Sequence, residues 1–368
     1  MKRLLAKYAV PVARHLPVFL RAPLQRAWHS YALTARNPRL SAAEYAERVS
    51  KETEIFDEQE IVHDLPEIYH YWSNKYLRPK LEEFGISNPD EFFAKFLIRS
   101  IEEHPGRSVR FVSLGCGNCD TEVRIAGILR DRGFTDFTLE CVDINATMLE
   151  RGAVHAANAG LSKHVVMTRG DFNRWRPDAR YDAIIANQSL HHVVELEDLF
   201  TSISRALNDD GRFITSDMIG RNGHMLWPEA LSILREYWQE LPKEKTFNVL
   251  LRRYEAEFGN WDCSGSGFEG IRAQDILPLL IERFDFEFFV GFANIIDPFI
   301  GRCHGPHLDA ASEKDRTFVD RIHARDEAEM LAGNIKPTHM MAVMRKPPFA
   351  DLACWKHMTP AFCVRKPD

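Results

Sequence analysis

Between residues 109 and 219, short apolar runs alternate with longer stretches of helical periodicity. The apolar runs are VRFVSL, FTLECVDI, HVVMTRGD, YDAIIANQSL and GRFITSDMI, which begin at Val109, Phe137, His164, Tyr181 and Gly211. Strands separated by helical stretches of about 12–15 residues are typical of a parallel sheet with crossover connections. This part of the chain therefore predicts an α/β fold with a doubly wound, mostly parallel sheet and helices on both faces.

The sequence on either side of this alternation predicts mostly helices. Residues 42–104 are helical in pattern and rich in aromatic residues, and Ser87-Asn88-Pro89 marks a helix start. After the fifth strand, helices are expected at 227–242, 243–261, 271–284 and 313–331, and strands at 284–296 and 338–346. The expected units are 1–105 (basic arm and helical region), 106–226 (core of alternating strands and helices), 227–312 (inserted helical cap and sixth strand), 313–346 (final helix and closing strand) and 347–368 (tail).

The first forty residues are basic, with eight Lys and Arg residues and no acidic residue before Glu44. Apolar residues alternate with these charges, and Pro11, Pro17 and Pro23 interrupt any long helix. No apolar core ending in small residues follows, so a secretory signal is not expected. Three interpretations stay open: an arm across the acidic remainder of the chain, peripheral contact with a membrane surface, or an organelle-targeting segment.

The overall composition excludes several classes of protein. The 53 acidic and 47 basic residues give a formal net charge of −6, which offers no general attraction to nucleic acid. Seven cysteines are too few, and odd in number, for a disulfide scaffold. No stretch approaches the ~20 apolar residues of a membrane-spanning helix. We therefore expect a cytoplasmic protein without a nucleic-acid partner.

Polar or flexible residues stand where the first three strands end. In VSLGCGNCDTE, Gly115 and Gly117 let the backbone approach a ligand at the start of a helix. Asp143 ends the second strand, where an acid can accept both hydroxyls of a ribose; it could instead cap the next helix. Gly170-Asp171 ends the third strand, where a carboxylate can accept from an adenine amino group; Asp171 could instead cap a turn. Together these residues predict an adenosine site.

In this order, the segments LGCGNCDTE, ECVDIN, RGDF, YDAIIANQSLHHV and ALNDDGRFITSD resemble the class I, Rossmann-like S-adenosylmethionine-dependent methyltransferases, especially the small-molecule branch. The resemblance covers roughly residues 109–226 and implies a seven-stranded sheet closed by the strand at 338–346. Cys119 stands where a dinucleotide fingerprint has its third glycine, so a smaller ligand without phosphates fits better. Two departures from the family stand out: Ser113 stands where the family commonly has an acid that meets the ligand's amino group, and the turn usually read as Pro-Gly-Gly is Asn208-Asp209-Asp210-Gly211. The resemblance implies S-adenosyl-L-methionine as methyl donor, bound by Gly115, Cys116, Gly117, Asp143, Ile144, Gly170, Asp171, Phe172, Asn187 and Gln188.

The resemblance also implies a catalytic pair. Some sugar O-methyltransferases of the family carry a catalytic histidine and aspartate at the positions of His191 and Asp217, which lie 26 residues apart. Imidazole suits the removal of a proton from a hydroxyl group at neutral pH. Two alternatives stay open: His192 or neither histidine is the base, and Asp217 caps a turn.

Further polar residues follow the fifth strand. Arg221, Asn222 and His224 could contact the substrate, with Arg221 suited to a carboxylate or phosphate, or could form a surface turn. No metal is expected, because the Cys116-x-x-Cys119 pair lacks a second pair at suitable spacing. The loop residues His304, His307 and Asp309 are likewise not expected to form a metal site.

The sequence as a whole predicts an S-adenosylmethionine-dependent methyltransferase that methylates a hydroxyl group of a small molecule, either a sugar or a secondary metabolite. One alternative is methylation at nitrogen or carbon of a small metabolite or quinone-like lipid. Another is a non-catalytic regulator that retains the nucleotide fold. A hydroxyl acceptor needs a general base, which the other two interpretations do not require.

Overall fold

The computed structural model describes residues 40–57, 64–265 and 267–365. The expectations for the basic N-terminal segment, up to residue 39, lie outside the described residues. The chain from Ala46 onward forms one compact unit. Within the described ranges, none of the helices combines the length and the apolar character needed to cross a membrane.

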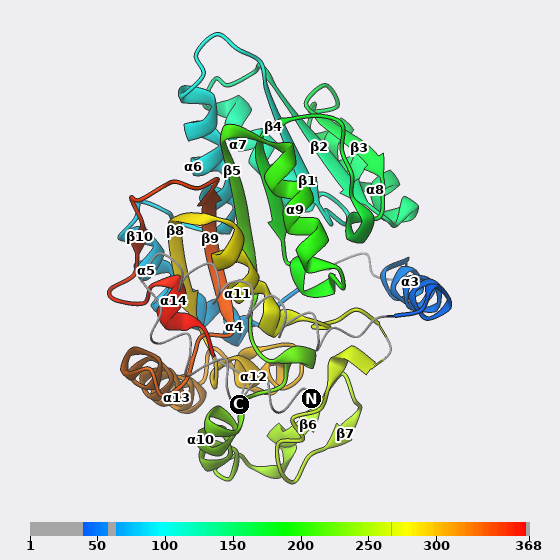
Figure 1. The fold of residues 1–368 in the computed structure, drawn as a ribbon. Helices are drawn as coiled ribbons and strands as arrows, with labels where there is room; N and C mark the ends of the chain where they lie inside the picture. The colour runs from blue at the N-terminus through cyan, green and yellow to red at the C-terminus, as the bar shows by residue number, and fades with distance from the viewer. Residues whose placement is uncertain (1–39, 58–63, 266, 366–368) are drawn as a thin grey trace, which may run out of the picture. The chain divides into compact units, whose positions relative to one another are not determined.

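The central sheet has eight strands in the order β10-β8-β9-β5-β4-β1-β2-β3 (Figure 1). The strands are β1 Val109–Leu114, β2 Phe137–Asp143, β3 Val165–Arg169, β4 Tyr181–Asn187, β5 Leu207–Met218, β8 Asp285–Phe292, β9 His339–Arg345 and β10 Ala353–Cys354. Strand β9 runs antiparallel to β5 and β8, and the other neighbours are parallel. The doubly wound, mostly parallel α/β sheet is thus confirmed. Seven strands were expected, and the eighth is β10, from the tail.

The topology fixes where a ligand can bind. The chain runs from β1 outward through β2 to β3, and then returns to form β4 on the other side of β1. Open α/β sheets bind ligands outside the carboxyl ends of the strands, at the point where the strand order reverses. The turns that follow β1 and β4 lie at this point, so the residues directly after Leu114 and Asn187 line the expected crevice.

Helices cover both faces of the sheet. On one side α6 (Pro89–Glu102) packs against α7 (Asp120–Asp131), and on the other α9 (Leu196–Ala206) packs against α11 (Ala273–Arg283) (Figure 1). Helix α8 (Ala146–Asn158) packs against β2 and β3 and contacts α7. In the described residues that precede α6, the helices are α3 Ala42–Asp57, α4 Glu67–Trp72, η1 Ser73–Leu77 (a π-helix) and α5 Arg78–Glu82. The helix start predicted at residues 87–89 is confirmed, because the Asn88 side chain accepts a hydrogen bond from the Glu91 amide at 2.9 Å.

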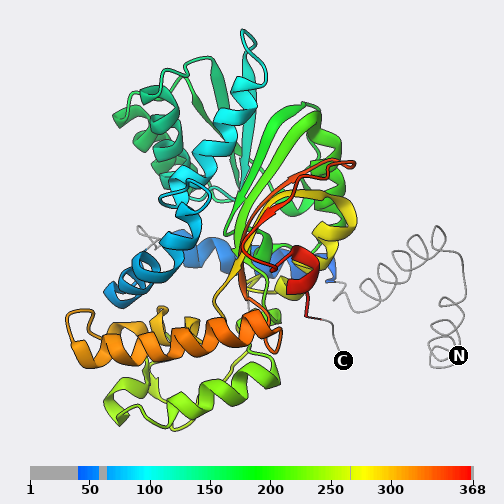
Figure 2. The same ribbon diagram turned by 90° about the vertical axis from the view of Figure 1, so that its left-hand side faces the viewer.

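Three further helices lie beyond the end of the sheet at which β5 leads into α10. They are α10 (Pro228–Trp238), α12 (Asp297–Ile300) and α13 (Glu313–Ala332), and Figure 2 shows α10 and α13 below the sheet. They stand on the side of the sheet where the carboxyl ends of the parallel strands lie, which is the side of the expected ligand site.

The helix expected at 243–261 is wrong. This segment forms a short 3-10 turn, η5 (Lys243–Thr246), followed by a two-stranded hairpin of β6 (Phe247–Asn248) and β7 (Arg253–Tyr254). The Asn248 side chain accepts from the Leu251 amide at 2.9 Å, and asparagine side chains that bond locally in this way favour turns over helix. The rings of Phe247 and Tyr254 pack across the hairpin with centroids 5.0 Å apart.

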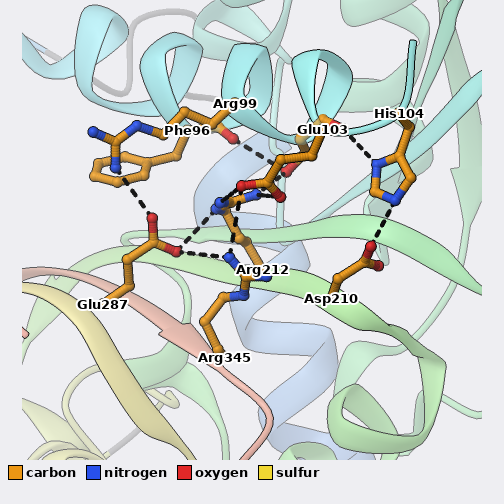
Figure 3. Close-up of polar contacts among 9 residues, drawn as sticks. Phe96, Arg99, Glu103, His104, Asp210, Arg212, Glu287 and Arg345 are labelled. Carbon is orange, nitrogen blue, oxygen red and sulfur yellow. Dashed lines mark hydrogen bonds and ion pairs between the residues drawn. The ribbon is translucent and has the colours of Figure 1, made fainter. Parts of the chain in front are cut away.

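A buried arginine ties α6 to the middle of the sheet. Arg212 on β5 is 2% exposed and donates hydrogen bonds to Glu103 beyond α6 at 2.8 Å and to Glu287 on β8 at 3.0 Å (Figure 3). Its guanidinium also donates to the Ser100 hydroxyl at 3.1 Å. Arg345 on β9 approaches Glu287 at 3.3 Å. A charge buried to this extent is tolerated only because it is fully paired.

Replacing Arg212 by alanine should lower the free energy of unfolding by about 3 kcal/mol, measured by urea unfolding. The change leaves the buried Glu287 carboxylate with only Arg345 and the half-exposed Arg99 as charged partners. A matched control is Arg325→Ala, because Arg325 pairs with Glu329 on the surface and such pairs contribute at most about 1 kcal/mol. Equal losses for the two variants would contradict the structural role of Arg212.

Candidate active site

The glycine turn after β1 packs directly against the turn after β4. Gly115 has φ +71°, and a Cβ atom placed on it would stand 2.6 Å from the Cβ of Ser189, so no other residue fits without a shift. Gly117 has φ +53°, and its amide donates to the Asp143 carboxylate at 2.9 Å. The two glycines thus allow the turn after β1 to approach the turn after β4 and to bond the acid that ends β2.

Asp143 does not cap the helix that follows it. Its other carboxylate oxygen accepts from the Asn145 amide at 2.8 Å, and the side chain is largely buried. Asn145 is the residue that caps α8, by accepting from the Met148 amide at 3.0 Å. Burial raises the pKa of Asp143 above its ordinary value. A carboxylate has about four acceptor positions, so these amides leave capacity for a ribose hydroxyl.

Asp171 caps a turn, and its contact with an adenine stays a prediction. Its side chain accepts from the Asn173 amide at 3.0 Å and caps the 3-10 turn η2 (Phe172–Arg174). The preceding Gly170 amide donates to the Asp143 carbonyl at 2.9 Å. The Phe172 ring lies 3.3 Å from a Cβ placed on Gly115, which puts it beside the glycine turn. The ends of β2 and β3 therefore meet the turn after β1.

The other expected cofactor residues lie at the same edge of the sheet. Cys116 and Ile144 are half-buried in the segments that follow β1 and β2. Asn187 ends β4, and the exposed Gln188, with φ +53°, donates its amide to the Ser216 carbonyl at 2.8 Å.

Glu122 places a carboxyl group beside Ser113. Ser113 is the position at which the family that the sequence resembles commonly has an acidic residue. The Ser113 hydroxyl donates to Glu122 on α7 at 2.7 Å, and Glu122 is 2% exposed. Burial raises the pKa of Glu122 to about 8. Glu122 was not among the predicted site residues, although it is the last residue of the motif VSLGCGNCDTE that contains the glycine turn.

His191 and Asp217 form a buried pair. His191 Nδ1 and Asp217 Oδ1 are 2.7 Å apart, and Asp217 is fully buried at the end of β5. The second Asp217 oxygen accepts from the amides of Ser189 (2.9 Å) and Leu190 (2.7 Å). A carboxylate only accepts hydrogen bonds, so His191 carries its proton on Nδ1 and leaves Nε2 as an acceptor. Asp217 therefore fixes both the turn after β4 and the orientation of the imidazole.

Two acidic residues that sequence reasoning missed complete this cluster. Glu52 on α3 pairs with His192 Nδ1 at 2.5 Å. Glu269 bonds His224 Nε2 at 2.6 Å and lies 3.5 Å from Nε2 of both His191 and His192. Each lies far from the histidine that it contacts in the sequence, and no motif marks it.

These neighbours separate the two histidines electrostatically. Burial, and then the charge of His192, lower the pKa of His191 below 6.5. Burial opposes protonation of His192 as well, but the hydrogen bond to Glu52 and the charges of Glu269, Glu52 and Asp217 outweigh it and raise the pKa of His192 to about 9. Burial alone would raise the pKa of Glu269, but the His224 hydrogen bond and the three nearby histidines hold it well below its usual range. At neutral pH the cluster therefore holds a neutral His191 beside a protonated His192.

The three residues expected at the substrate are not all brought together. His224 packs edge-on against His191, with ring centroids 5.2 Å apart. Arg221 instead donates to the Leu226 carbonyl at 3.2 Å and covers the ring of Trp227. Asn222 exchanges two hydrogen bonds with Gln274. Only His224 of the three therefore lies beside the His191–Asp217 pair.

The donor atoms of His191, His224 and Glu269 lie within 4.8 Å of one another, a spacing that a metal ion could also use. Glu269 already shares a hydrogen bond with His224 at 2.6 Å. In the described ranges, His304, His307 and Asp309 form no group of that kind.

Comparison with known proteins finds similarity to methyltransferases. A family model described as a methyltransferase domain matches residues 106–259. The 27-O-demethylrifamycin SV methyltransferase of Amycolatopsis mediterranei is 26% identical over 195 residues, covering 48% of this chain and 68% of that protein. The polyketide synthase ThaQ of Burkholderia thailandensis is 28% identical over 153 residues, and the match spans 38% of this chain and 7% of that protein.

A sterol 24-C-methyltransferase of Gibberella zeae, ERG6B, is 29% identical over 119 residues, covering 32% of this chain and 29% of that protein. Among solved structures, the O-methyltransferase from a trans-AT PKS multienzyme of Brevibacillus brevis, in complex with S-adenosyl-L-homocysteine, aligns with a TM-score of 0.42 and 14% identity, covering 83% of this chain and 85% of that one. The comparisons support an S-adenosylmethionine-dependent methyltransferase that acts on a small molecule, and the match to the methyltransferase-domain model lies within residues 106–259.

Proposed function

We propose that this protein transfers the methyl group of S-adenosylmethionine to a hydroxyl group of a small molecule, of the sugar or secondary-metabolite class. The observation that carries the choice of a hydroxyl is the buried His191–Asp217 pair, 2.7 Å apart at the end of the sheet where β4 and β5 stop. A hydroxyl acceptor must lose a proton during the reaction, and a neutral imidazole with a free Nε2 can take it.

The cofactor residues are proposed from the geometry of the loop. S-adenosylmethionine, when bound, supplies an electrophilic methyl group on a sulfonium. Gly115 and Gly117 give the backbone close access to it, and Asp143 accepts from the ribose hydroxyls with its remaining capacity. Glu122 provides the carboxyl group for the amino end, beside Ser113. Asp171 caps its own turn and contributes by placing Phe172 at the loop.

The residues of the histidine cluster divide the work of proton transfer. Asp217 holds the Nδ1–H of His191, so that Nε2 faces the acceptor's proton. The acceptor oxygen then forms its bond to the methyl carbon as the carbon–sulfur bond breaks, and the protein holds these atoms in line. Glu269 lies 3.5 Å from His191 Nε2 and stabilises the positive charge that His191 gains.

The pH dependence of turnover should identify the base. Because burial lowers the pKa of His191, its imidazole is neutral at pH 7 and above, so kcat/KM should be level there and fall at acidic pH. If His192 were the base, activity would instead rise until pH exceeds its raised pKa of about 9. Initial rates between about pH 5 and 10 distinguish the two. A profile still rising above pH 8 would contradict His191 as the base.

Methylation at carbon is the second candidate, because the chain is similar to sterol 24-C-methyltransferases over part of its length. A direct test incubates the purified protein with labelled S-adenosylmethionine and separate panels of hydroxylated, amine and alkene-bearing acceptors. The proposal predicts label in the products of hydroxylated acceptors, with S-adenosylhomocysteine formed in equal amount. Transfer only to carbon or nitrogen acceptors would overturn the choice of a hydroxyl. Binding of the donor without any transfer would indicate a non-catalytic regulator.

A further inference from the structure

Three cysteines converge beneath the glycine turn. Cys116 lies in the turn, Cys119 precedes α7, and Cys141 lies on β2. Their Sγ atoms all lie within 4.8 Å of one another. A fourth sulfur atom lies beside this cluster. Met167 on β3 pairs with Cys141 on β2, and its Sδ atom is 3.4 Å from Cys119 Sγ. None of the cysteines is in a disulfide.

The backbone around the cluster is built for close approach. Cys119 has φ +58°, a left-handed conformation that is unusual for a residue other than glycine and that turns the chain into α7. Gly152 on α8 lies against it: a Cβ there would stand 2.9 Å from Cys119 Sγ. Cys119 and Cys141 are buried, whereas Cys116 is half-buried and leaves a way in from solvent.

We propose that Cys116, Cys119 and Cys141 bind one soft, thiophilic metal ion of the Cu(I) kind, with the Met167 thioether as a weaker fourth ligand. Thiolate and thioether ligands favour such ions over hard cations. Three sulfurs that each lie ~2.3 Å from a shared ion stand roughly 4 Å apart, which this cluster can reach with little movement. On binding, each thiol releases its proton to solvent as its metal–sulfur bond forms, and nothing is oxidised.

The position of the cluster links it to the proposed cofactor site. Cys116 and Cys119 flank Gly117, whose amide holds Asp143. An ion held by these two sulfurs fixes the turn on which the ribose acid depends and stops it from adjusting to the donor, so the ion and S-adenosylmethionine should weaken each other's binding. This coupling rests on the proposed function, whereas the metal site itself does not. Linkage requires the effect to be the same in both directions.

The experiment titrates the reduced, full-length protein with Cu(I) under anaerobic conditions, without S-adenosylmethionine. We expect one ion per chain and an ultraviolet thiolate-to-copper charge-transfer band. The band should be lost in Cys119→Ser and Cys141→Ser, and in Cys116→Ser, whose half-buried position makes it the variant that folds most readily. Cys263→Ser and Cys354→Ser, which change half-buried cysteines elsewhere, should keep it.

Absence of a band at one equivalent, or a band that survives in Cys116→Ser, would overturn the metal site. A second measurement compares the dissociation constant of S-adenosylmethionine with and without bound Cu(I), and a several-fold weakening is expected. An unchanged constant together with an intact band would contradict the coupling alone. A failure to bind copper leaves the proposed methyl transfer standing, so the two ideas fail separately.

Discussion

Replacing His191 by alanine should lower kcat for a hydroxyl acceptor by roughly 10²–10⁴-fold. The substitution removes the only neutral imidazole that is held by Asp217, and His192 cannot replace it because its pKa is raised to about 9 and it is protonated at neutral pH. The affinity for S-adenosylmethionine should stay the same, since His191 bonds Asp217, whereas the proposed ligands of the donor are the glycine turn and Asp143. Initial rates with saturating acceptor, together with calorimetry of donor binding, measure both quantities.

The matched control for this prediction is His357→Ala. His357 is exposed near the C-terminus and bonds only the Leu331 carbonyl, at 2.9 Å, so its loss should leave kcat within a few-fold. A His191→Ala enzyme that turns over within a few-fold of the parent would point to a carbon or nitrogen acceptor. That acceptor would need no general base on this histidine.

Replacing Asp143 by alanine should weaken S-adenosylmethionine binding about 10–100-fold, because a hydrogen bond to a charged group contributes about 1.5–3 kcal/mol. The carboxylate both offers acceptor capacity for a ribose and holds the Gly117 and Asn145 amides in place. Asp143→Asn keeps the shape and one acceptor oxygen, so its loss should be smaller. Calorimetric titration of the donor measures each variant.

Asp136→Ala is the control, since Asp136 is exposed at the opposite end of β2 and should leave the donor affinity unchanged. If Asp143→Ala bound S-adenosylmethionine as tightly as the parent protein, Asp143 would not be a ribose ligand. In that event its amide contacts would be its whole role.

The strands of the sheet were predictable because each is a buried apolar run. Alternation of these runs with helices identified β1 to β5, β8 and β9 within a few residues of their observed bounds. Strand β10 was not predictable, because two residues carry no period and its position depends on pairing with β8. The segment of β6 and β7 was predicted as a helix because the spacing of its apolar residues is compatible with a helix. The hydrogen bond that the Asn248 side chain accepts from the Leu251 amide instead stabilises the turn of a hairpin.

The site was predictable only in part, for reasons of distance along the chain. His191 and Asp217 could be paired because they lie at the ends of the neighbouring strands β4 and β5, at positions where the family that the sequence resembles carries a catalytic pair. Glu52 and Glu269 reach the histidines from α3 and from the segment before α11, and no local pattern marks either. The orientation of individual side chains likewise depends on tertiary packing. The Arg221 guanidinium, for example, lies over the ring of Trp227 and not beside the histidines. The third thiol beside Cys116 and Cys119 is supplied by strand register, which spacing along the chain does not reveal.

The most direct measurement is a crystal structure of the full chain with bound S-adenosylhomocysteine, the product nucleoside. The account predicts that both sugar hydroxyls lie within about 3.2 Å of the Asp143 carboxylate, and that the sulfur faces His191 across the turn after β4. A nucleoside lodged at another edge of the sheet, or an Asp143 side chain turned away from the sugar, would contradict it.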